Sequence, residues 1–266
     1  MIEGIVLRRM AAERRLGLDL IEKDYVLGWI LKGISACSVR DKVIFKGGTA
    51  LSKIYYPLDW RISDDFDFTL LDDSKMEEVL LILQKELPSI IEELSGGIRL
   101  TFKDSLLHQD FLRATVSFTG PITRHRTKIE VTREKGLGNY HSINVPTMYD
   151  YPDFSLLVYT LDNILAEKLR AIIERTKIRD YYDVWRLLGL KVVDSKLLRE
   201  KFFEKCEGKD IEFKNVNQFF RYNLINILEP HLEDLTRMST DLIPPLNEMI
   251  SDIRENLESI FQVYIN

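Results

Sequence analysis

Two aspartates separated by one residue, Asp65 and Asp67, are the residues of this chain best suited to carry chemistry. They alternate with Phe66 and Phe68, and side chains along a β-strand point to opposite faces in turn. The aspartates therefore share one face, where two neighbouring carboxylates repel each other unless a cation lies between them. Mg²⁺ takes oxygen ligands and is commonly shared with substrate phosphates. The pair predicts a metal site for an in-line displacement at phosphorus.

A glycine-rich turn precedes this pair. Gly47, Gly48 and Thr49 follow a short apolar segment, 42–45, and lead into a predicted helix over 50–55. Glycines allow a backbone to approach a ligand closely, and the free amides of a helix N-terminus favour a phosphate. Either motif alone is commonly structural, a simple turn or a solvated strand edge. The functional prediction depends on the two motifs occurring together and in this order.

Composition indicates an ordinary globular protein. The chain has 266 residues, of which 45% are hydrophobic and 30% charged, enough for one large domain or two intimate ones. The net charge of −5 weakens a purely nucleic-acid-binding interpretation without excluding local basic patches. Two distant cysteines, Cys37 and Cys206, favour a reduced protein. The first residues lack a signal peptide and no apolar stretch is long enough to span a membrane, so we expect a cytoplasmic location.

Three further strands are predicted after a helix over 74–94. They cover 98–103, 111–118 and 127–132, and their alternation predicts an antiparallel extension of the sheet. Glu130 lies in the last of them. If that strand lies beside the aspartate strand, Glu130 would complete a three-carboxylate metal site. The alternative is an exposed strand residue paired with Lys128 or Arg133.

The second half of the chain reads differently. Residues 136–153 are rich in glycine and proline and are expected to be irregular, and from Leu161 the pattern is almost wholly helical. Lys168 and Arg175 share a helix face, where a lysine can reach phosphates, whereas Asp183 could simply pair with Arg179 at i,i+4. Several apolar residues are predicted to form the core of a C-terminal bundle, among them Phe202, Phe219, Tyr222 and Ile227.

The expected fold is α+β, with a mixed sheet and helices followed by an α-helical C-terminal bundle. We predict the first domain over 1–155, including N-terminal helices, and a helical domain over 156–266. In this order the motifs resemble those of the AbiEii-type nucleotidyltransferase toxins of the DNA polymerase β-like superfamily. The matching motifs are Glu22-Lys23-Asp24-Tyr25, Gly47-Gly48-Thr49, Arg61-x-Ser63-x-Asp65-x-Asp67, Lys128-x-Glu130, Ala166-Glu167-Lys168-Leu169 and Arg179-Asp180-x-x-Asp183.

The resemblance implies a nucleotidyltransferase fold and a Mg²⁺-dependent transfer of NMP from an NTP to an acceptor. In some relatives the acceptor is the end of a tRNA, and the proteins serve as toxins of type IV toxin–antitoxin or abortive-infection systems with an antitoxin encoded alongside. The implied metal ligands are Asp65, Asp67 and Glu130, with Glu130 alternatively activating the attacking hydroxyl. The implied nucleotide contacts are Gly47, Gly48, Thr49, Ser63 and Lys168, and Asp183, with Asp180 as a second candidate, would complete the site.

Two other function classes stay open at the level of sequence. One is a nucleotide- or RNA-binding regulatory protein of the same fold with weak or no catalysis. The presence of every acidic and basic residue of the motifs argues against it. The other is a different phosphotransfer enzyme, such as a kinase or a metal-dependent nuclease. The fold alone does not decide among them.

Overall fold

A mixed sheet of seven strands carries the aspartate pair in the computed structural model, which describes residues 1–57 and 59–262 and confirms the α+β class. The strands follow the order β3-β4-β5-β2-β1-β7-β6. Their bounds are β1 (Val43–Lys46), β2 (Phe66–Leu70), β3 (Arg99–His108), β4 (Phe111–Thr119), β5 (Arg124–Thr132), β6 (Tyr140–Asn144) and β7 (Ser155–Tyr159).

Alternation within β2 separates the chemical face from the core face, as the sequence predicts. Phe66 and Phe68 are buried, and both rings lie beside Phe45 of β1, at centroid distances of 6.3 and 5.2 Å. Asp67 lies on the opposite face and is half-buried. The sheet thus anchors this strand through aromatic side chains, while the Asp67 carboxylate lies on the face away from them.

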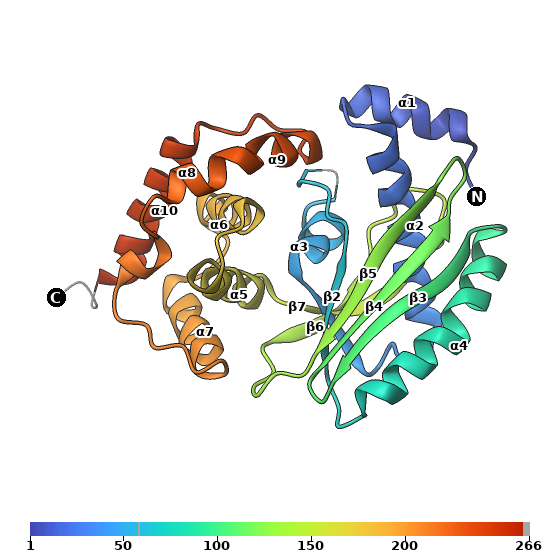
Figure 1. Ribbon diagram of the computed structural model, residues 1–266, viewed down its shortest axis with the longest axis horizontal. Coiled ribbons are helices and arrows are strands. Elements are labelled where there is room, and N and C mark those ends of the chain that lie inside the picture. The colour runs from blue at the N-terminus through green and yellow to red at the C-terminus, as the bar shows by residue number, and fades with distance from the viewer. Residues whose placement is uncertain (58, 263–266) are drawn as a thin grey trace. The chain divides into compact units, whose positions relative to one another are not determined.

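The three strands β3, β4 and β5 form the predicted antiparallel extension, and β5 continues it into the centre by pairing with β2 in parallel. Helix α4 (Met76–Ser95) packs along β3, and helix α2 (Leu18–Ala36) packs against α4 (Figure 1). The short helix α1 (Gly4–Arg14) precedes α2 in the chain and contacts it. The alternating burial of β4 shows that one face of this extension lies in the core and the other is more open.

Strand β6 corrects the expectation that 136–153 is irregular. β6 lies within that segment at an edge of the sheet, and four of its five side chains are exposed, so its sequence has no apolar alternation. β7 begins after that segment and pairs with β1 in parallel. An edge strand whose side chains mostly face water lacks the alternating pattern that identifies strands from sequence alone.

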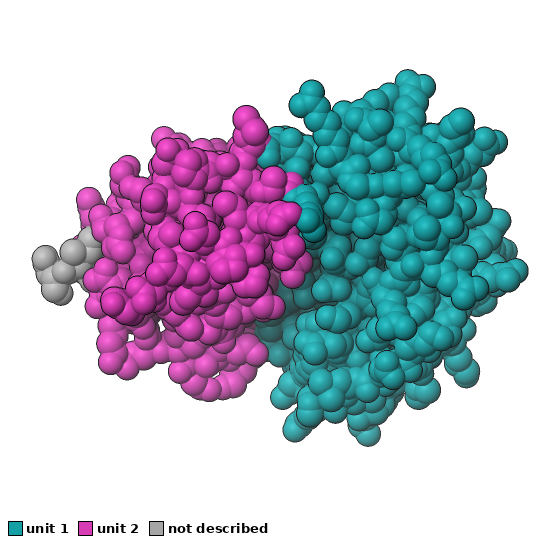
Figure 2. Space-filling view, turned by 45° about the horizontal axis from the view of Figure 1, so that its top comes forward, with its two compact units in different colours: residues 1–134, 140–158, 237–241 teal, residues 135–139, 159–236, 242–266 magenta. Residues whose placement is uncertain are grey.

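The chain forms two compact units, coloured separately in Figure 2. Unit 1 comprises residues 1–134, 140–158 and 237–241, and unit 2 comprises 135–139, 159–236 and 242–266. The main division falls between Val158 and Tyr159, close to the predicted domain boundary at 155, and two short segments belong to the unit on the other side of it. Unit 1 contains the sheet and the first helices, and unit 2 is helical.

Unit 2 is built from helices packed around aromatic side chains. Its α-helices are α5 (Leu161–Glu174), α6 (Ile178–Leu190), α7 (Ser195–Glu207), α8 (Leu224–Leu228), most of α9 (Leu232–Met238), and α10 (Leu246–Ile260). The ring of Phe202 packs against Phe213, Phe219 and Phe261, at centroid distances of 5.0, 5.6 and 5.2 Å. The prediction that Tyr222 and Ile227 belong to this core is wrong, because their side chains are 90% and 42% exposed.

Both cysteines are buried and free of disulfides. Burial raises the pKa of the Cys37 thiol to about 12 and that of the Cys206 thiol to about 11, so neither carries a thiolate at neutral pH. Within residues 1–57 and 59–262, no helix combines the length and apolar character needed to cross a membrane.

Candidate active site

Two threonine hydroxyls hold the backbone that enters β2. The Thr49 hydroxyl donates a hydrogen bond to the main-chain carbonyl of Asp65, and the Thr127 hydroxyl donates to that of Asp64 at 2.6 Å. Thr49 is fully buried, so its side chain positions the backbone of Asp65 in this structure. The two bonds come from the helix after the glycine turn and from β5, and together they fix the residue that starts the aspartate pair.

One charged residue from each of four strands forms a row across the sheet. In the strand register Lys46 lies opposite Asp67, and Asp67 lies opposite Glu130. Arg113 lies opposite Glu130 on the next strand, and its Nε donates to the Glu130 carboxylate at 2.7 Å. The prediction that Glu130 lies beside the aspartate strand is confirmed. Two carboxylates thus occupy the middle of the row, with a cation at each end.

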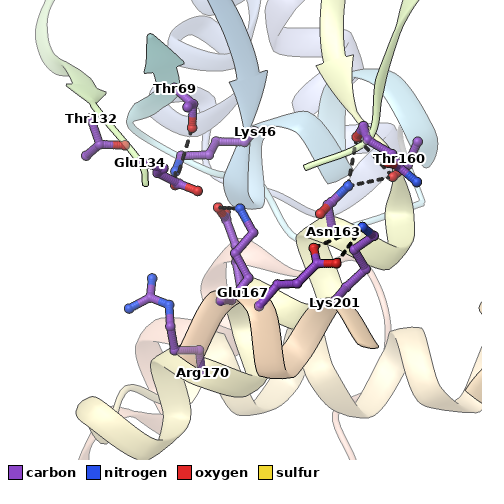
Figure 3. Close-up of polar contacts among 12 residues, drawn as sticks. Lys46, Thr69, Thr132, Glu134, Thr160, Asn163, Glu167, Arg170 and Lys201 are labelled. Carbon is purple, nitrogen blue, oxygen red and sulfur yellow. Dashed lines mark hydrogen bonds and ion pairs between the residues drawn. The ribbon is translucent and has the colours of Figure 1, made fainter. Parts of the chain in front are cut away.

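Lys46 is itself paired within unit 1. Its ammonium contacts the Glu134 carboxylate, which also accepts a hydrogen bond from the Thr69 hydroxyl at 3.3 Å (Figure 3). Lys46 and Glu134 are almost fully buried. The pair closes one end of the charged row and balances a cation that would otherwise be buried alone.

The glycine turn lies directly against the aspartates. Gly47 has φ +76°, a conformation that favours glycine, and a Cβ placed on it would be 2.4 Å from Oδ2 of Asp67. A Cβ on Gly48 would be 2.7 Å from Nη2 of Arg61 and 3.2 Å from Oγ of Ser63. The two glycines are the first residues of α3 (Gly47–Ala50), which continues as a π-helical turn over Leu51–Tyr55. The turn, a carboxylate, a guanidinium and a hydroxyl therefore meet at one place.

Arg61 is a site residue to which the sequence analysis gave no role. It is 2% exposed and lies beside Gly48, where it can offer planar donors to a phosphate. The signal was present, since Arg61, Ser63, Asp65 and Asp67 follow one another at intervals of two. An interval of two in an extended segment directs side chains to one side.

The donor set suits a hard cation. Asp67 has its carboxylate next to the glycine turn, and magnesium sites commonly use one or two carboxylates plus substrate oxygens. The role of Asp65 as a second ligand stays a prediction. Over the part of the chain that the structure describes, no three histidine, cysteine or acidic side chains are gathered closely enough to hold a metal by themselves. Because Arg113 holds the Glu130 carboxylate, the role of Glu130 as a third ligand stays a prediction.

The segment Glu22-Lys23-Asp24 of α2 contacts the residues that flank the site. Asp24 binds the ammonium of Lys53 at 2.6 Å, and both side chains are buried. Lys53 lies in the turn that follows α3, and Lys23 Nζ lies 3.4 Å from the Asp64 carboxylate. Helix α2 therefore contacts both the helical segment after the glycine turn and the segment that leads into β2.

Glu22 holds the loop between β4 and β5. Its fully buried carboxylate accepts hydrogen bonds from the backbone amides of Ile122 and Thr123 and from the Thr123 hydroxyl, at 2.5, 2.9 and 2.7 Å, and contacts the His125 ring at 3.1 Å. Burial alone would raise the pKa of Glu22, but the hydrogen bonds from Thr123, His125 and Ile122 together lower it below its ordinary value of 4.5.

A Glu22→Gln variant is expected to lose about 1–3 kcal/mol of stability at pH 7, because the amide replaces one of the accepting oxygens with a donor. A lowered folded-state pKa means that the unfolded state binds the proton first. The contribution of Glu22 is thus fully present above about pH 4.5 and is lost as pH falls through the folded-state pKa. Urea unfolding at pH 7 and at pH 4 measures both effects. Glu93→Gln, at an exposed position of α4, is the matched control. Equal stability losses for Glu22→Gln and Glu93→Gln would contradict this role.

Lys168, Asp180 and Asp183 form an ion cluster within unit 2. Lys168 Nζ lies 2.7 Å from Asp180 and 2.9 Å from Asp183, and Arg175 Nε lies 2.8 Å from Asp180. Both aspartates are buried. Burial alone would raise the pKa of Asp180, but Lys168 and Arg175 hold it well below its ordinary range. The role of Lys168 in binding phosphate and that of Asp183 in completing the site stay predictions.

Solved structures share this fold. MenT4, a nucleotidyltransferase toxin from Mycobacterium tuberculosis H37Rv, matches with a TM-score of 0.73 at 18% identity, covering 98% of this chain and 90% of that one. JHP933 from Helicobacter pylori matches with a TM-score of 0.56 at 16% identity, covering 94% of each chain. At these identities the likeness establishes the fold. Compared by sequence with curated proteins, the chain has no significant match.

Family membership follows from the sequence over most of its length. The family described as nucleotidyl transferase AbiEii toxin, type IV toxin–antitoxin system, matches residues 29–262. That range includes the glycine turn, the aspartate pair, Glu130 and the ion cluster of unit 2. The chain therefore belongs to the AbiEii family of nucleotidyltransferase toxins, and it is an enzyme of the nucleotidyltransferase type.

Proposed function

We propose that this enzyme transfers NMP from a Mg²⁺-bound NTP to the end of an RNA, with tRNA as the first acceptor to test. The observation that carries the proposal is the contact between the glycine turn and the aspartate pair, where Asp67 lies against Gly47 and Arg61 lies against Gly48. Hydrogen-bond donors for phosphate and ligands for the metal must lie close together if a nucleoside triphosphate is to be held at its reacting end.

In this proposal each candidate site residue of unit 1 has its own role. Asp65 and Asp67 would hold Mg²⁺, and the bound metal would neutralise charge on the triphosphate and lower the pKa of the attacking hydroxyl. The amides of Gly47 and Gly48, the Ser63 hydroxyl and the Arg61 guanidinium bind the triphosphate. Thr49 keeps Asp65 in place through its hydrogen bond to the backbone.

The transfer forms a bond between the acceptor oxygen and the α-phosphorus and breaks the bond from that phosphorus to the bridging oxygen, so pyrophosphate leaves. Glu130 lies opposite Asp67 in the strand register, which supports a role for it in accepting the hydroxyl proton or as a third ligand. Positioning and electrostatic stabilisation supply most of the rate in such transfers.

Labelled nucleotides test this reaction. Purified protein is incubated with total RNA, Mg²⁺ and each NTP labelled on the α-phosphate, with parallel reactions labelled on the γ-phosphate. We expect α-label in a tRNA-sized band, lost with EDTA and in Asp65→Ala. Transfer of γ-label would indicate a kinase, shortened RNA would indicate a nuclease, and no label with any NTP would favour the binding-protein alternative.

The toxin role extends the same proposal to the cell. We expect the protein to act in the cytoplasm on RNA and to be neutralised by an antitoxin encoded nearby. Expression in a bacterial host should stop growth, Asp65→Ala should restore it, and co-expression of the neighbouring gene should also restore it. Growth arrest by Asp65→Ala equal to that of the unaltered protein would contradict a catalytic toxin.

A further inference from the structure

A stripe of basic side chains runs along β5 toward the aspartate site. Arg124, Arg126 and Lys128 alternate with half-buried or buried residues and are all exposed, and the next residue on their face is Glu130. We call these three residues the basic stripe. Because a strand rises about 3.4 Å per residue, neighbouring cations of the stripe are roughly 7 Å apart along β5. This spacing is comparable to that of successive phosphates along a single nucleic-acid strand.

The charges of the basic stripe are not balanced by acidic side chains of the described residues. Among residues 1–57 and 59–262, none of its three side chains makes an ion pair, although the chain as a whole has 42 acidic residues against 37 basic ones. Exposed cations on a net acidic protein are commonly balanced by neighbouring carboxylates. Three unbalanced cations on one strand face create a local positive potential.

Hydroxyl groups accompany each cation on the neighbouring strand. In the register of β4 with β5, Thr119 lies opposite Arg124, Ser117 opposite Arg126, and Thr115 opposite Lys128. Side chains directly opposite one another on an antiparallel pair share a face. A cation and a hydroxyl donor thus recur at each step, and both groups bind phosphate oxygens in nucleic-acid complexes.

The outer end of the basic stripe is anchored. Glu22 accepts hydrogen bonds from Ile122 and Thr123, just before Arg124, and contacts His125, just after it. At the other end, the Thr127 hydroxyl is bound to the Asp64 carbonyl. The strand is therefore held at both ends in one register, which lowers the entropy lost when a ligand binds.

We propose that the basic stripe binds the phosphate backbone of the RNA end that accepts the nucleotide and leads that end to Asp65 and Asp67. This inference rests on the proposed function and adds a surface to it. Charge complementarity and the regular cation spacing favour a polynucleotide, since its phosphates repeat at fixed intervals. The stripe also lies on the same strand face as Glu130, so a chain bound along it ends at the carboxylates.

The test compares two triple variants that change the net charge equally. The stripe variant is Arg124→Ala/Arg126→Ala/Lys128→Ala, and the control is Arg8→Ala/Lys75→Ala/Lys85→Ala, three exposed cations outside the sheet. Fluorescence anisotropy with fluorescently labelled tRNA gives Kd over a range of salt concentrations. We expect the stripe variant to bind on the order of 10- to 100-fold more weakly and its salt slope to fall by about 2, at about 0.7 per phosphate lost from a single strand. The control should match the unaltered protein.

Steady-state transfer separates binding from chemistry. We expect the KM for RNA to rise in the stripe variant while the KM for NTP and the melting temperature stay unchanged. If the triple variant does not fold, Arg126→Glu alone must raise the KM for RNA and Arg126→Lys must restore it. Equal RNA affinity and equal salt slope in the stripe variant and the unaltered protein would overturn the proposal, as would loss of antitoxin binding with RNA binding intact. If the unaltered protein transfers no nucleotide, the proposed reaction fails, but the binding measurement still decides the role of the stripe.

Discussion

Asp67→Asn is expected to lose nucleotide transfer by on the order of 10³-fold or more while the protein stays folded. The change keeps the size of the side chain but removes the charge that, in the proposed reaction, holds the metal against the glycine turn. A metal contributes several kcal/mol to such a transition state. Asp67 lies opposite Glu130 on one neighbouring strand and opposite Lys46 on the other, so removal of its charge relieves a repulsion and also weakens an attraction. A melting temperature close to that of the unaltered protein checks that the variant stays folded.

Asp64→Asn provides the matched control for this prediction. It removes a carboxylate that lies one residue before Asp65 and contacts Lys23 at 3.4 Å. We expect it to change the transfer rate far less than Asp67→Asn. Rates are measured with α-labelled NTP over a series of Mg²⁺ concentrations. Equal losses in the two variants, or full activity in Asp67→Asn, would show that the metal site lies elsewhere.

Lys168→Ala is expected to destabilise the protein by about 3–5 kcal/mol, because it leaves two buried carboxylates without their shared cation. For a chain of this size that corresponds to a fall in melting temperature of roughly 10 °C. The structure thus changes how such a variant must be interpreted, since loss of transfer alone would not separate phosphate binding from unfolding.

Two further variants isolate the ion cluster. Arg175→Ala removes a cation that contacts the same Asp180 but is itself half exposed, so its effect should be much smaller. Lys168→Ala/Asp180→Asn/Asp183→Asn removes the buried charges together and should recover much of the lost stability. Thermal unfolding followed by circular dichroism gives all three values. An unchanged melting temperature in Lys168→Ala would contradict the structural role, and transfer assays then test its predicted phosphate contact.

Local patterns were enough to predict the centre of the site. Alternation around Asp65 and Asp67 predicted one carboxylate face and one core face, and the burial of Phe66 and Phe68 confirms the core face. Asp65 lies just before β2, so the shared face of the two carboxylates stays a prediction. The glycine turn was recognisable because this backbone requires glycine: at Gly47 φ is positive, and a carboxylate lies too close for a Cβ atom. The second half of β5 could be predicted because Ile129 and Val131 are apolar and buried, whereas Lys128 and Glu130 between them are charged.

Long-range pairing was beyond the reach of those patterns. The partner of Glu130 is Arg113, on an adjacent strand, whereas local reasoning offered only Lys128 or Arg133. Similarly, the partner of Lys46 is Glu134, 88 residues later in the chain. Which of several nearby or distant charges forms a pair depends on strand register, and register is a property of the folded sheet.

The hydrogen bonds of Glu22 have a consequence for the order of folding. They join α2 to a loop 100 residues later, and β5 must also find β2 across about 60 intervening residues. Contacts of such sequence separation form late, after the local helices and the β4–β5 hairpin. The loop before Arg124 therefore reaches its final geometry only when α2 has docked. We therefore expect the basic stripe to reach the geometry proposed for RNA binding only late in refolding.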